Sequence, residues 1–490
     1  MTAFETLSAR LREIQLLSDT ASCLGWDQET YLPPKGVAHR ADQLAFLAGE
    51  IHSRATNKQF EETLQAAEAE GLAEQASNLR EIRHHFDQST QLPKALVEKD
   101  AQTSALAKAS WSEAREKDDF QAFAPHLQSL VDLALEKANI WGYQDEPYTA
   151  LLSNYERNSN TSEIADLFEK LGPELSSIAA EAVAHSKEQT LPSLNGEAPI
   201  EKQKILNREV AESLGFDFES GRIDTTTHPF CTTLGAQDVR LTTRYDESDF
   251  SSSLFGVLHE AGHGLYEQGL PSADAHLPSG KAVSLGIHES QSRLVENHVG
   301  RSLPFWEKWY PRAQELFPHL QAISLPDFMK AVNRANYTTI RVEADESTYD
   351  LHIILRFKIE RALLNKELAV ADLPAAWNEK FEKLFGFTPP NDVEGCLQDI
   401  HWSMGGIGYF PNYSLGNLNA AQLFVAAQQE DEIRSSFEKG DSTPLIAWMR
   451  KNVHAHGSSL FPQDLMQKAT GQPTQGDAYL KHLRSRFLRS

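Results

Sequence analysis

Hydrophobic residues recur three or four positions apart through most of the chain, which is the spacing of one face of an α-helix. Leu7, Leu11, Ile14 and Leu17 show it near the start. Similar stripes cover residues 60–90, 96–140, 160–190 and 350–366. Proline and glycine mark the expected breaks between helices, which are Pro33-Pro34, Pro147, Pro192, Gly196, Pro271, Pro278, Pro326 and Pro389-Pro390.

No short-period repeat, low-complexity tract or Gly/Ser linker divides the sequence into separate domains. We therefore expect a mainly α fold in one domain that covers residues 1–490. Two lobes around a central cleft are its expected internal division.

One stretch departs from the helical pattern. Residues 238–245, DVRLTTRY, are rich in β-branched residues and alternate in character, so they predict a strand. An exposed strand edge here could pair with an extended peptide. The alternative is an ordinary short hairpin.

Charge and composition narrow the range of partners. The chain has 46 Lys and Arg against 69 Asp and Glu, a formal net charge of -23. Such a surface repels nucleic acid and anionic membranes, so neither is an expected partner. No segment approaches the roughly 20 apolar residues of a membrane helix. The N-terminus lacks a basic region followed by an apolar run, so we expect no secretory signal.

The three cysteines, Cys23, Cys231 and Cys396, lie far apart and form no C-x-x-C pair. Neither a disulfide framework nor a cysteine metal site is therefore expected. The reducing cytoplasm is the predicted location.

Residues 252–268, SSLFGVLHEAGHGLYEQ, predict a helix that begins among Ser251 to Ser253 and stops at Gly269 and Pro271. It contains the pattern H-E-x-x-H. His259 and His263 are four residues apart and share one face, so both imidazoles can bind one metal ion. Glu260 is offset by one residue and can reach a water molecule on that ion. The alternative is a structural helix with two surface histidines.

Two glycines inside this helix weigh against the structural alternative. Gly262 and Gly264 each cost roughly 1 kcal/mol of helix stability relative to alanine. Bare backbone at these positions indicates that another part of the chain or a ligand approaches closely.

A catalytic zinc ion usually takes three protein ligands and one water molecule. Residues 283–299, VSLGIHESQSRLVENHV, predict a second helix that supplies the third ligand, and Glu289 is the best candidate. Glu267 and Glu296 are its competitors. His288 is a further nitrogen ligand or a partner of a ligand.

Several motifs in order resemble the carboxypeptidase Taq family of thermostable carboxypeptidases over nearly the whole chain. They are Trp26-Asp-Gln-Glu-Thr-Tyr31-Leu-Pro-Pro34, His228-Pro-Phe230, Asp238-Val-Arg240-Leu-Thr242, His259-Glu-Ala-Gly-His263, His288-Glu-Ser-Gln-Ser-Arg293, Ile340-Arg-Val-Glu-Ala-Asp345, His401-Trp-Ser and Gly408-Tyr-Phe-Pro-Asn-Tyr413. Departures from the family pattern are small: Val295 stands where we expect Trp, and Asn154 and Arg157 change a segment after Tyr148.

This resemblance implies a large helical fold with a deep central cleft and a small antiparallel sheet, similar to angiotensin-converting enzyme and neurolysin. It implies a homodimer that binds peptides with a free C-terminus and releases single residues with broad specificity. One divalent metal per chain is expected, most simply zinc, with cobalt as the alternative.

The resemblance also suggests roles for residues outside the metal motif. His401, Tyr409 and Tyr413 are candidate donors to the oxyanion of the reaction, although a G-Y-F-P-N-Y segment can also be only a packed aromatic loop.

Arg341 is the first candidate for binding the substrate carboxylate, because a guanidinium binds a carboxylate with two hydrogen bonds. An ion pair with Asp345 is its alternative role, and the two roles are compatible. Arg240 and Arg293 are the next candidates. His228 and Asp238 belong to the same predicted substrate-binding group as Arg240.

Two other functions stay open at this point. The first is a zinc oligopeptidase or dipeptidyl carboxypeptidase with the same metal site and a different cleft. The second is a helical scaffold without activity in which H-E-x-x-H arose by chance. Analysis of reaction products separates the first from a carboxypeptidase, and metal analysis of the purified protein separates the second.

Overall fold

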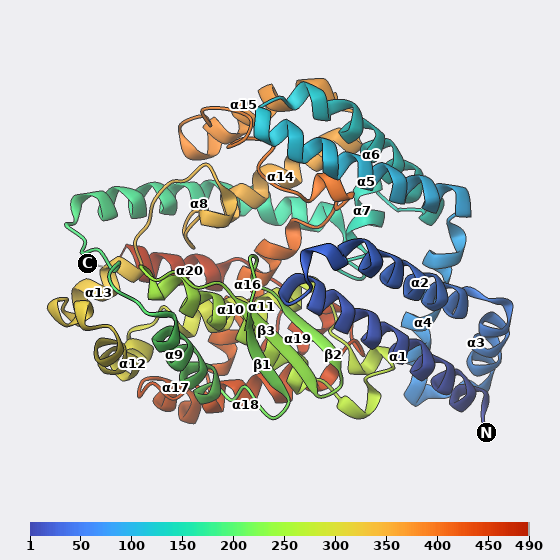
Figure 1. Ribbon diagram of the computed structural model, residues 1–490, viewed down its shortest axis with the longest axis horizontal. Helices are drawn as coiled ribbons and strands as arrows, with labels where there is room; N and C mark the ends of the chain where they lie inside the picture. Colours follow the sequence, from blue (N-terminus) through green and yellow to red (C-terminus); the bar gives the residue numbers. More distant parts are fainter. Residues whose placement is uncertain (489–490) are drawn as a thin grey trace.

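Helices make up most of the computed structural model, which describes residues 1–488 (Figure 1). The N-terminal group contains α1 (Ala3–Thr30), α2 (Val37–Thr56), α3 (Lys58–Glu70) and α4 (Ala76–Gln91). The upper lobe in Figure 1 contains α5 (Lys94–Lys117), α6 (Phe120–Trp141), α7 (Pro147–Leu152), α8 (Thr161–Glu188), α14 (Tyr349–Leu364) and α15 (Leu373–Phe385). The lower lobe contains α9 (Ile200–Ser213), α10 (Phe250–Gly269), α11 (Leu285–Arg293), α12 (Leu303–Leu316), α13 (Leu325–Val332), α16 (Pro411–Ala427), α17 (Asp431–Phe437), α18 (Thr443–Asn452), α19 (Pro462–Thr470) and α20 (Asp477–Phe487).

Two of the long hydrophobic stripes are each divided between two helices. Gly71, with a φ of 65°, ends α3 in the left-handed conformation that glycine adopts without steric cost. Asp118, with a φ of 53°, ends α5 in the same way. The helical prediction for both stretches is therefore confirmed, with an added turn inside each.

The sheet has three strands, β1 (Gly221–Thr225), β2 (Cys231–Gly235) and β3 (Asp238–Thr243), in the order β1-β3-β2. β3 pairs in parallel with β1 and antiparallel with β2, so the sheet is mixed where a purely antiparallel one was expected. The predicted strand is present, but the expectation that it offers a free edge is wrong. Because β3 is the central strand, both of its edges are already paired.

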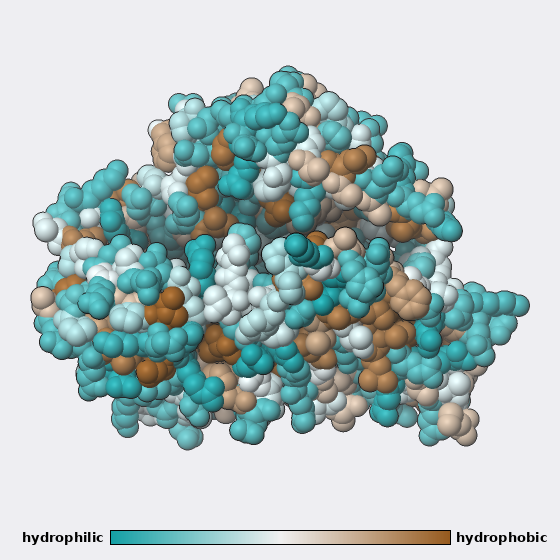
Figure 2. Space-filling model, in the orientation of Figure 1, coloured by the Kyte–Doolittle hydropathy of each residue, from teal (hydrophilic) through white to brown (hydrophobic). Residues whose placement is uncertain are grey.

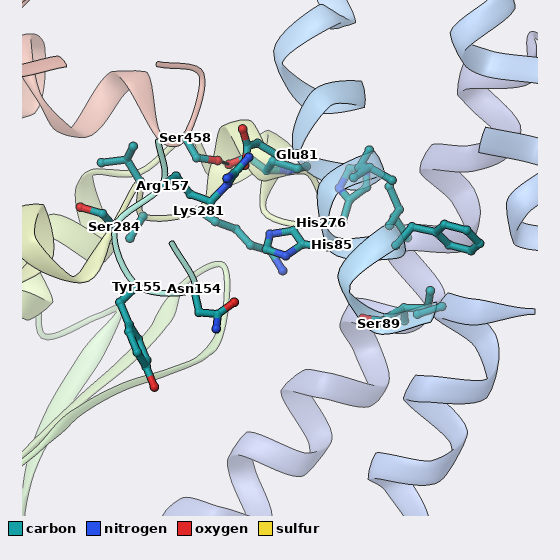
Figure 3. Close-up of a pocket in the computed structure, with 18 of the residues that line it drawn as sticks. Glu81, His85, Ser89, Asn154, Tyr155, Arg157, His276, Lys281, Ser284 and Ser458 are labelled. Carbon is teal, nitrogen blue, oxygen red and sulfur yellow. Dashed lines mark hydrogen bonds and ion pairs between the residues drawn. The ribbon is translucent and has the colours of Figure 1, made fainter. Parts of the chain in front are cut away.

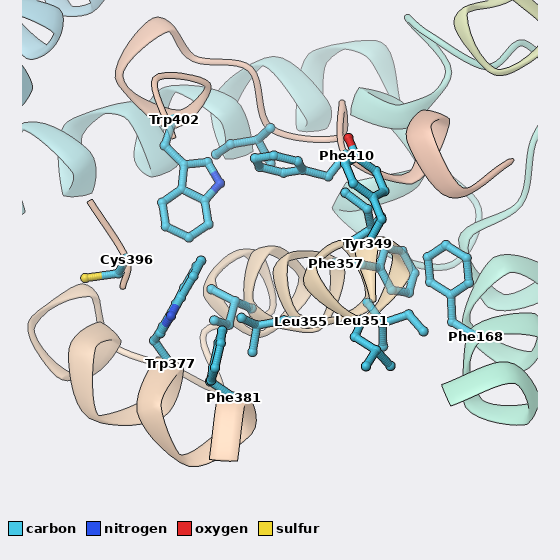
Figure 4. Packing of buried hydrophobic residues seen from close by; sticks show 14 of the residues in the cluster. Phe168, Tyr349, Leu351, Leu355, Phe357, Trp377, Phe381, Cys396, Trp402 and Phe410 are labelled. Carbon is cyan, nitrogen blue, oxygen red and sulfur yellow. The ribbon is translucent and has the colours of Figure 1, made fainter. Parts of the chain in front are cut away.

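Buried apolar residues form a large core in each lobe. In the upper lobe, aromatic rings surround α14: Phe168, Phe357, Trp377, Phe381 and Trp402 all belong to this core (Figure 4). The lower core is built around α10 and α12, where Phe250 stacks on Phe317 and meets the edge of Trp306. A third, smaller core holds the N-terminal helices together. The mainly helical fold class is confirmed.

Helix α16 connects the two large cores. Its Leu415 and Leu418 belong to the upper core, whereas Ala420 and Leu423 belong to the lower core. A recess runs between the lobes on the face drawn in Figure 2. None of the helices in residues 1–488 is both long and apolar enough to cross a membrane.

Candidate metal centre

Helix α10 presents the H-E-x-x-H pattern. It begins after Asp249, whose carboxylate accepts hydrogen bonds from the backbone N–H groups of Ser251 and Ser252. The cap is therefore Asp249 and not one of the predicted serines, because an aspartate in extended conformation satisfies the free N–H groups better. The capped helix ends at Gly269, as predicted.

Helices α10 and α11 touch through their backbones at Gly262. A Cβ atom on Gly262 would lie 2.4 Å from the carbonyl oxygen of Gln291 and 2.5 Å from the Cα of Ser292. A Cβ on Gly264 would meet the side chains of Phe216 and Leu241 at 2.7 and 2.8 Å. The expected close approach is thus present at both glycines. At Gly262 it brings α11 within reach of the two histidines.

Three donor atoms converge between these helices. The Oε2 atom of Glu289 lies 3.7 Å from His259 Nε2 and 3.5 Å from His263 Nε2. Tetrahedral ligands with bonds of about 2 Å are separated by about 3.3 Å, so the spacing fits a zinc ion. His259, His263 and Glu289 form one of two groups in residues 1–488 whose donor atoms lie close enough to hold a metal ion.

The histidines are oriented by hydrogen bonds to their other ring nitrogens. His259 Nδ1 lies 2.9 Å from Glu296 Oε2, and His263 Nδ1 lies 3.1 Å from the carbonyl oxygen of His288. A proton on each Nδ1 leaves each Nε2 free to bind metal, which is the usual arrangement of zinc-bound imidazoles. Glu296, a competitor for the third ligand in the sequence, therefore orients a ligand instead.

His288 and Glu267 support the site from behind. His288 Nδ1 lies 2.6 Å from His263 Nδ1, and His288 Nε2 lies 2.8 Å from Glu267 Oε1. Glu267 also accepts a hydrogen bond from Thr233 in β2. Neither residue belongs to the three-donor group, so the structure places both as partners of a ligand.

Glu289 itself is held on two sides. Its Oε1 accepts a hydrogen bond from Arg293 Nε at 2.7 Å, which leaves Oε2 toward the histidines. On the other side, helix α16 packs against it through Gly416, where an added Cβ would lie 2.4 Å from Glu289 Cγ. Arg293 is thus hydrogen-bonded to Glu289, and its part in binding the substrate carboxylate stays a prediction.

Glu260 lies beside the three donors and is 6% exposed. Burial raises the pKa of its carboxyl group to about 7. A glutamate with that pKa can both accept and return a proton near neutral pH.

A cavity of about 320 Å³ exposes these groups. It is lined by Pro229, Phe230, Cys231, His259, Glu260, His263, Leu285, His288, Glu289, Tyr409, Asn412 and Tyr413. Tyr409 and Tyr413 thus face the metal centre, whereas His401 reaches it only through Tyr413, at 3.3 Å. Asn412 and Leu285 were not predicted as site residues from the sequence, because asparagine and leucine are not typical metal ligands or proton-transfer groups.

Arg341 lies one layer behind the cavity. Its guanidinium carbon is 4.9 Å from the centre of the Tyr413 ring, and its Nε and Nη2 donate to Asp399 at 3.1 and 2.7 Å. Asp345 is not its partner, because that carboxylate accepts hydrogen bonds from Asn336 and Ser347 instead. The segment is a short 3₁₀ turn, η7 (Arg341–Glu343), so the predicted helical spacing does not apply.

Arg356 also pairs with Asp399, at 2.7 Å from Nε, so two guanidinium groups share one carboxylate. Burial opposes ionisation of Asp399, but the charges of Arg356 and Arg341 hold its pKa well below the usual range. Arg341, Arg356 and Asp399 together therefore carry one surplus positive charge close to Tyr413. Burial lowers the pKa of the neighbouring His401 to about 4, so that its imidazole is neutral at pH 7.

The remaining predicted substrate-binding residues lie outside the cavity lining. Arg240 and Asp238 form a bidentate pair on β3, and Arg240 stacks over Trp26 at 4.2 Å. His228 is exposed on the loop before β2, next to Pro229. Their part in substrate binding stays a prediction.

Two imidazoles and a carboxylate around one point, with a buried glutamate beside them, define a metal-dependent peptidase. The family model for the carboxypeptidase Taq (M32) metallopeptidases matches residues 6–487, and the chain belongs to this family. It is accordingly a metallocarboxypeptidase, a hydrolase of peptide bonds that uses a divalent metal ion.

Individual relatives agree with this assignment. Thermostable carboxypeptidase 1 of Thermus thermophilus is 40% identical, with 99% of this chain and 98% of the relative covered. The crystal structure of the M32 carboxypeptidase from Deinococcus radiodurans superposes with a TM-score of 0.96, 36% identity and coverage of 99% and 98%. Metallocarboxypeptidase 1 of Trypanosoma cruzi has the same TM-score, 34% identity and 99% coverage of both chains.

Replacing His263 by alanine should abolish metal binding and activity together, because only two donors then remain. Metal content by atomic emission, on protein that retains its helical circular dichroism, checks this expectation. His276→Ala is the matched control, since His276 lies outside the metal-centre cavity and should leave one metal ion per chain. Stoichiometric metal with full turnover in His263→Ala would overturn the assignment.

Proposed function

We propose that the chain is a zinc-dependent carboxypeptidase that hydrolyses the last peptide bond of its substrates and releases single amino acids with broad specificity. The observation that carries the proposal is the convergence of His259, His263 and Glu289 beside Glu260 in one cavity. His259, His263 and Glu289 would hold the metal. Cobalt accepts the same nitrogen and oxygen donors and is the alternative ion.

A bound zinc ion would polarise the scissile carbonyl and make a water molecule more acidic. The Glu260 carboxylate would then accept the proton of the attacking water and donate it to the leaving amine as the C–N bond breaks. Tyr409 and Tyr413 line the same cavity, and their hydroxyl groups would donate hydrogen bonds to the oxyanion.

Recognition of the chain end requires a local positive charge, since a net charge of -23 repels a carboxylate. The surplus charge of Arg341, Arg356 and Asp399 lies directly behind Tyr413 and meets this need. Arg341 would orient the terminal carboxylate through this field, and the neutral imidazole of His401 would be a hydrogen-bond donor at the front of the group.

We also propose a homodimer, a cytoplasmic location and a single domain. The homodimer is the one that the resemblance implies, whereas a cytoplasmic location comes from the cysteine usage and one domain spanning residues 1–490 from the absence of linkers. Sedimentation velocity on the purified protein tests the first of them.

Product analysis tests the proposed reaction. From a mixed peptide library, mass spectrometry should find free amino acids released one at a time from the C-terminus. Dipeptides or internal fragments would instead support the dipeptidyl carboxypeptidase or oligopeptidase alternative, which uses the same metal site.

A further inference from the structure

A second cavity, of about 380 Å³, lies between the N-terminal helices and the catalytic body. Helices α1, α3 and α4 supply an apolar wall that includes Leu11, Ile14, Phe60, Ile82 and Phe86. The opposite wall consists of the segments 154–157 and 276–285, which carry Asn154, Tyr155, Arg157 and Lys281 (Figure 3). Nothing in the reaction described so far uses this space.

The cavity begins next to the metal centre. Leu285 lines both cavities, so one side chain separates them. Tyr155 lines the second cavity, and its ring centre is 5.3 Å from that of Tyr409 in the first. The two spaces are thus neighbouring parts of one cleft.

A row of contacts through three tyrosine rings connects Arg341, the proposed anchor, with the second cavity. From Arg341 they lead to Tyr413 at 4.9 Å, from Tyr413 to Tyr409 at 5.4 Å, and from Tyr409 to Tyr155 at 5.3 Å. The second cavity therefore opens at the end of the row farthest from the proposed anchor. A peptide whose last residue lies near Arg341 would extend its preceding residues this way.

Lys281 stands out among the polar groups of the cavity. Its ammonium donates a hydrogen bond to Gln15 Oε1 at 2.6 Å, and no carboxylate of residues 1–488 forms an ion pair with it. Arg157, by contrast, is paired with Glu81 at 3.0 Å. Burial lowers the pKa of Lys281, and the charges of Asp19 and Glu267 across a neighbouring cavity oppose that change.

We propose that this cavity binds the third and fourth residues of the substrate, counted from its C-terminus, and that Lys281 favours an acidic side chain there. The apolar wall binds the aliphatic part of these residues, and the unpaired ammonium supplies the charge. The third and fourth residues are the second and third on the N-terminal side of the scissile bond, and each carries an extended chain about 3.3 Å further from the metal centre. The proposal rests on the proposed carboxypeptidase function and adds to it a preference for sequence upstream of the cut.

The first test varies substrate length. N-acetylated peptides of two, three and four residues with a free C-terminus should show kcat/KM rising by about tenfold or more from two residues to four. Ser89→Trp places a bulky ring in the cavity at an exposed position of α4 and should remove most of this rise. Ser112→Trp, at an exposed position of α5 outside the cavity lining, is the matched control and should keep it.

The second test varies charge. With Glu, Gln or Lys as the third residue from the C-terminus, the wild type should prefer Glu to Lys by roughly fivefold, the upper end for an ion pair of an exposed side chain. Lys281→Met should bring this ratio close to one, while Lys281→Arg and the exposed-surface control Lys439→Met should keep it. The ratio within each variant cancels any general loss of activity.

Equal kcat/KM for all lengths in the wild type, or a full length effect in Ser89→Trp, would overturn the binding site. An unchanged Glu-to-Lys ratio in Lys281→Met would overturn the role of the ammonium. Failure of the proposed function is a different result, because it would appear as dipeptide products from the peptides of three and four residues.

Discussion

Glu260→Gln should lower kcat by roughly 10² to 10⁴-fold while the protein keeps about one metal ion per chain, because the amide preserves the shape of the side chain but cannot accept a proton. The measurements are metal content and turnover of one peptide on the same preparation. Loss of metal in Glu260→Gln would instead identify Glu260 as a ligand.

The matched control for this change is Glu267→Gln, because Glu267 is a second, half-buried carboxylate on α10 that faces His288 and Thr233. Its effect on kcat should be smaller, because Glu267 supports His288 and does not take part in proton transfer. In the wild type, activity should fall as the pH falls through the pKa of Glu260, which burial raises to about 7. A metal ion bound beside Glu260 favours its ionised form, so in the metal-bound enzyme this loss of activity occurs at a lower pH.

Arg341→Ala should lower kcat/KM for peptides with a free C-terminus by roughly 10- to 1000-fold, because it removes the positive charge behind Tyr413 that attracts the terminal carboxylate. Removing Arg341 removes the surplus positive charge, because Arg356 and Asp399 then neutralise each other. Lysine at this position should restore only part of the activity, since it lacks the planar fork.

Peptides with an amidated C-terminus provide the comparison. They should be poor substrates of the wild type and should be little affected by Arg341→Ala. Equal cleavage of acid and amide by the wild type would favour the oligopeptidase alternative. If the Arg341 variant keeps the preference for the acid, the anchor lies elsewhere, and Arg240→Ala is the next variant to measure.

The sequence predicts the metal centre well because its chemistry is encoded locally. Two histidines one helical turn apart must face the same way, and Gly262 between them and Gly264 after them indicate a close neighbour. The choice among Glu267, Glu289 and Glu296 is harder, because it depends on which carboxylate the crossing of α10 and α11 brings to the histidines. The close approach at Gly262 sets that crossing, and Gly416 of α16, 127 residues beyond Glu289, makes room for the Glu289 side chain.

Contacts between residues far apart in the sequence could not be predicted, because local spacing says nothing about how distant segments pack. Asp399 lies 58 residues from Arg341, so local spacing favoured the nearer Asp345 as its partner. β3 is the central strand because β1, which precedes the β2–β3 hairpin in the sequence, pairs with it in parallel on the side away from β2. The cavity at Lys281 arises only when the N-terminal helices pack against segments near residues 155 and 280.

The position of Gly416 has a mechanical consequence. Tyr413, which faces the metal cavity, and Gly416, against which the Glu289 side chain packs, lie three residues apart on the same helix. The distance between the Tyr413 hydroxyl and the Glu289 carboxylate is therefore set by one helix, α16, and not by the separation of the lobes. A displacement of the N-terminal helices, which pack in a separate small core with Leu277, would leave this spacing unchanged.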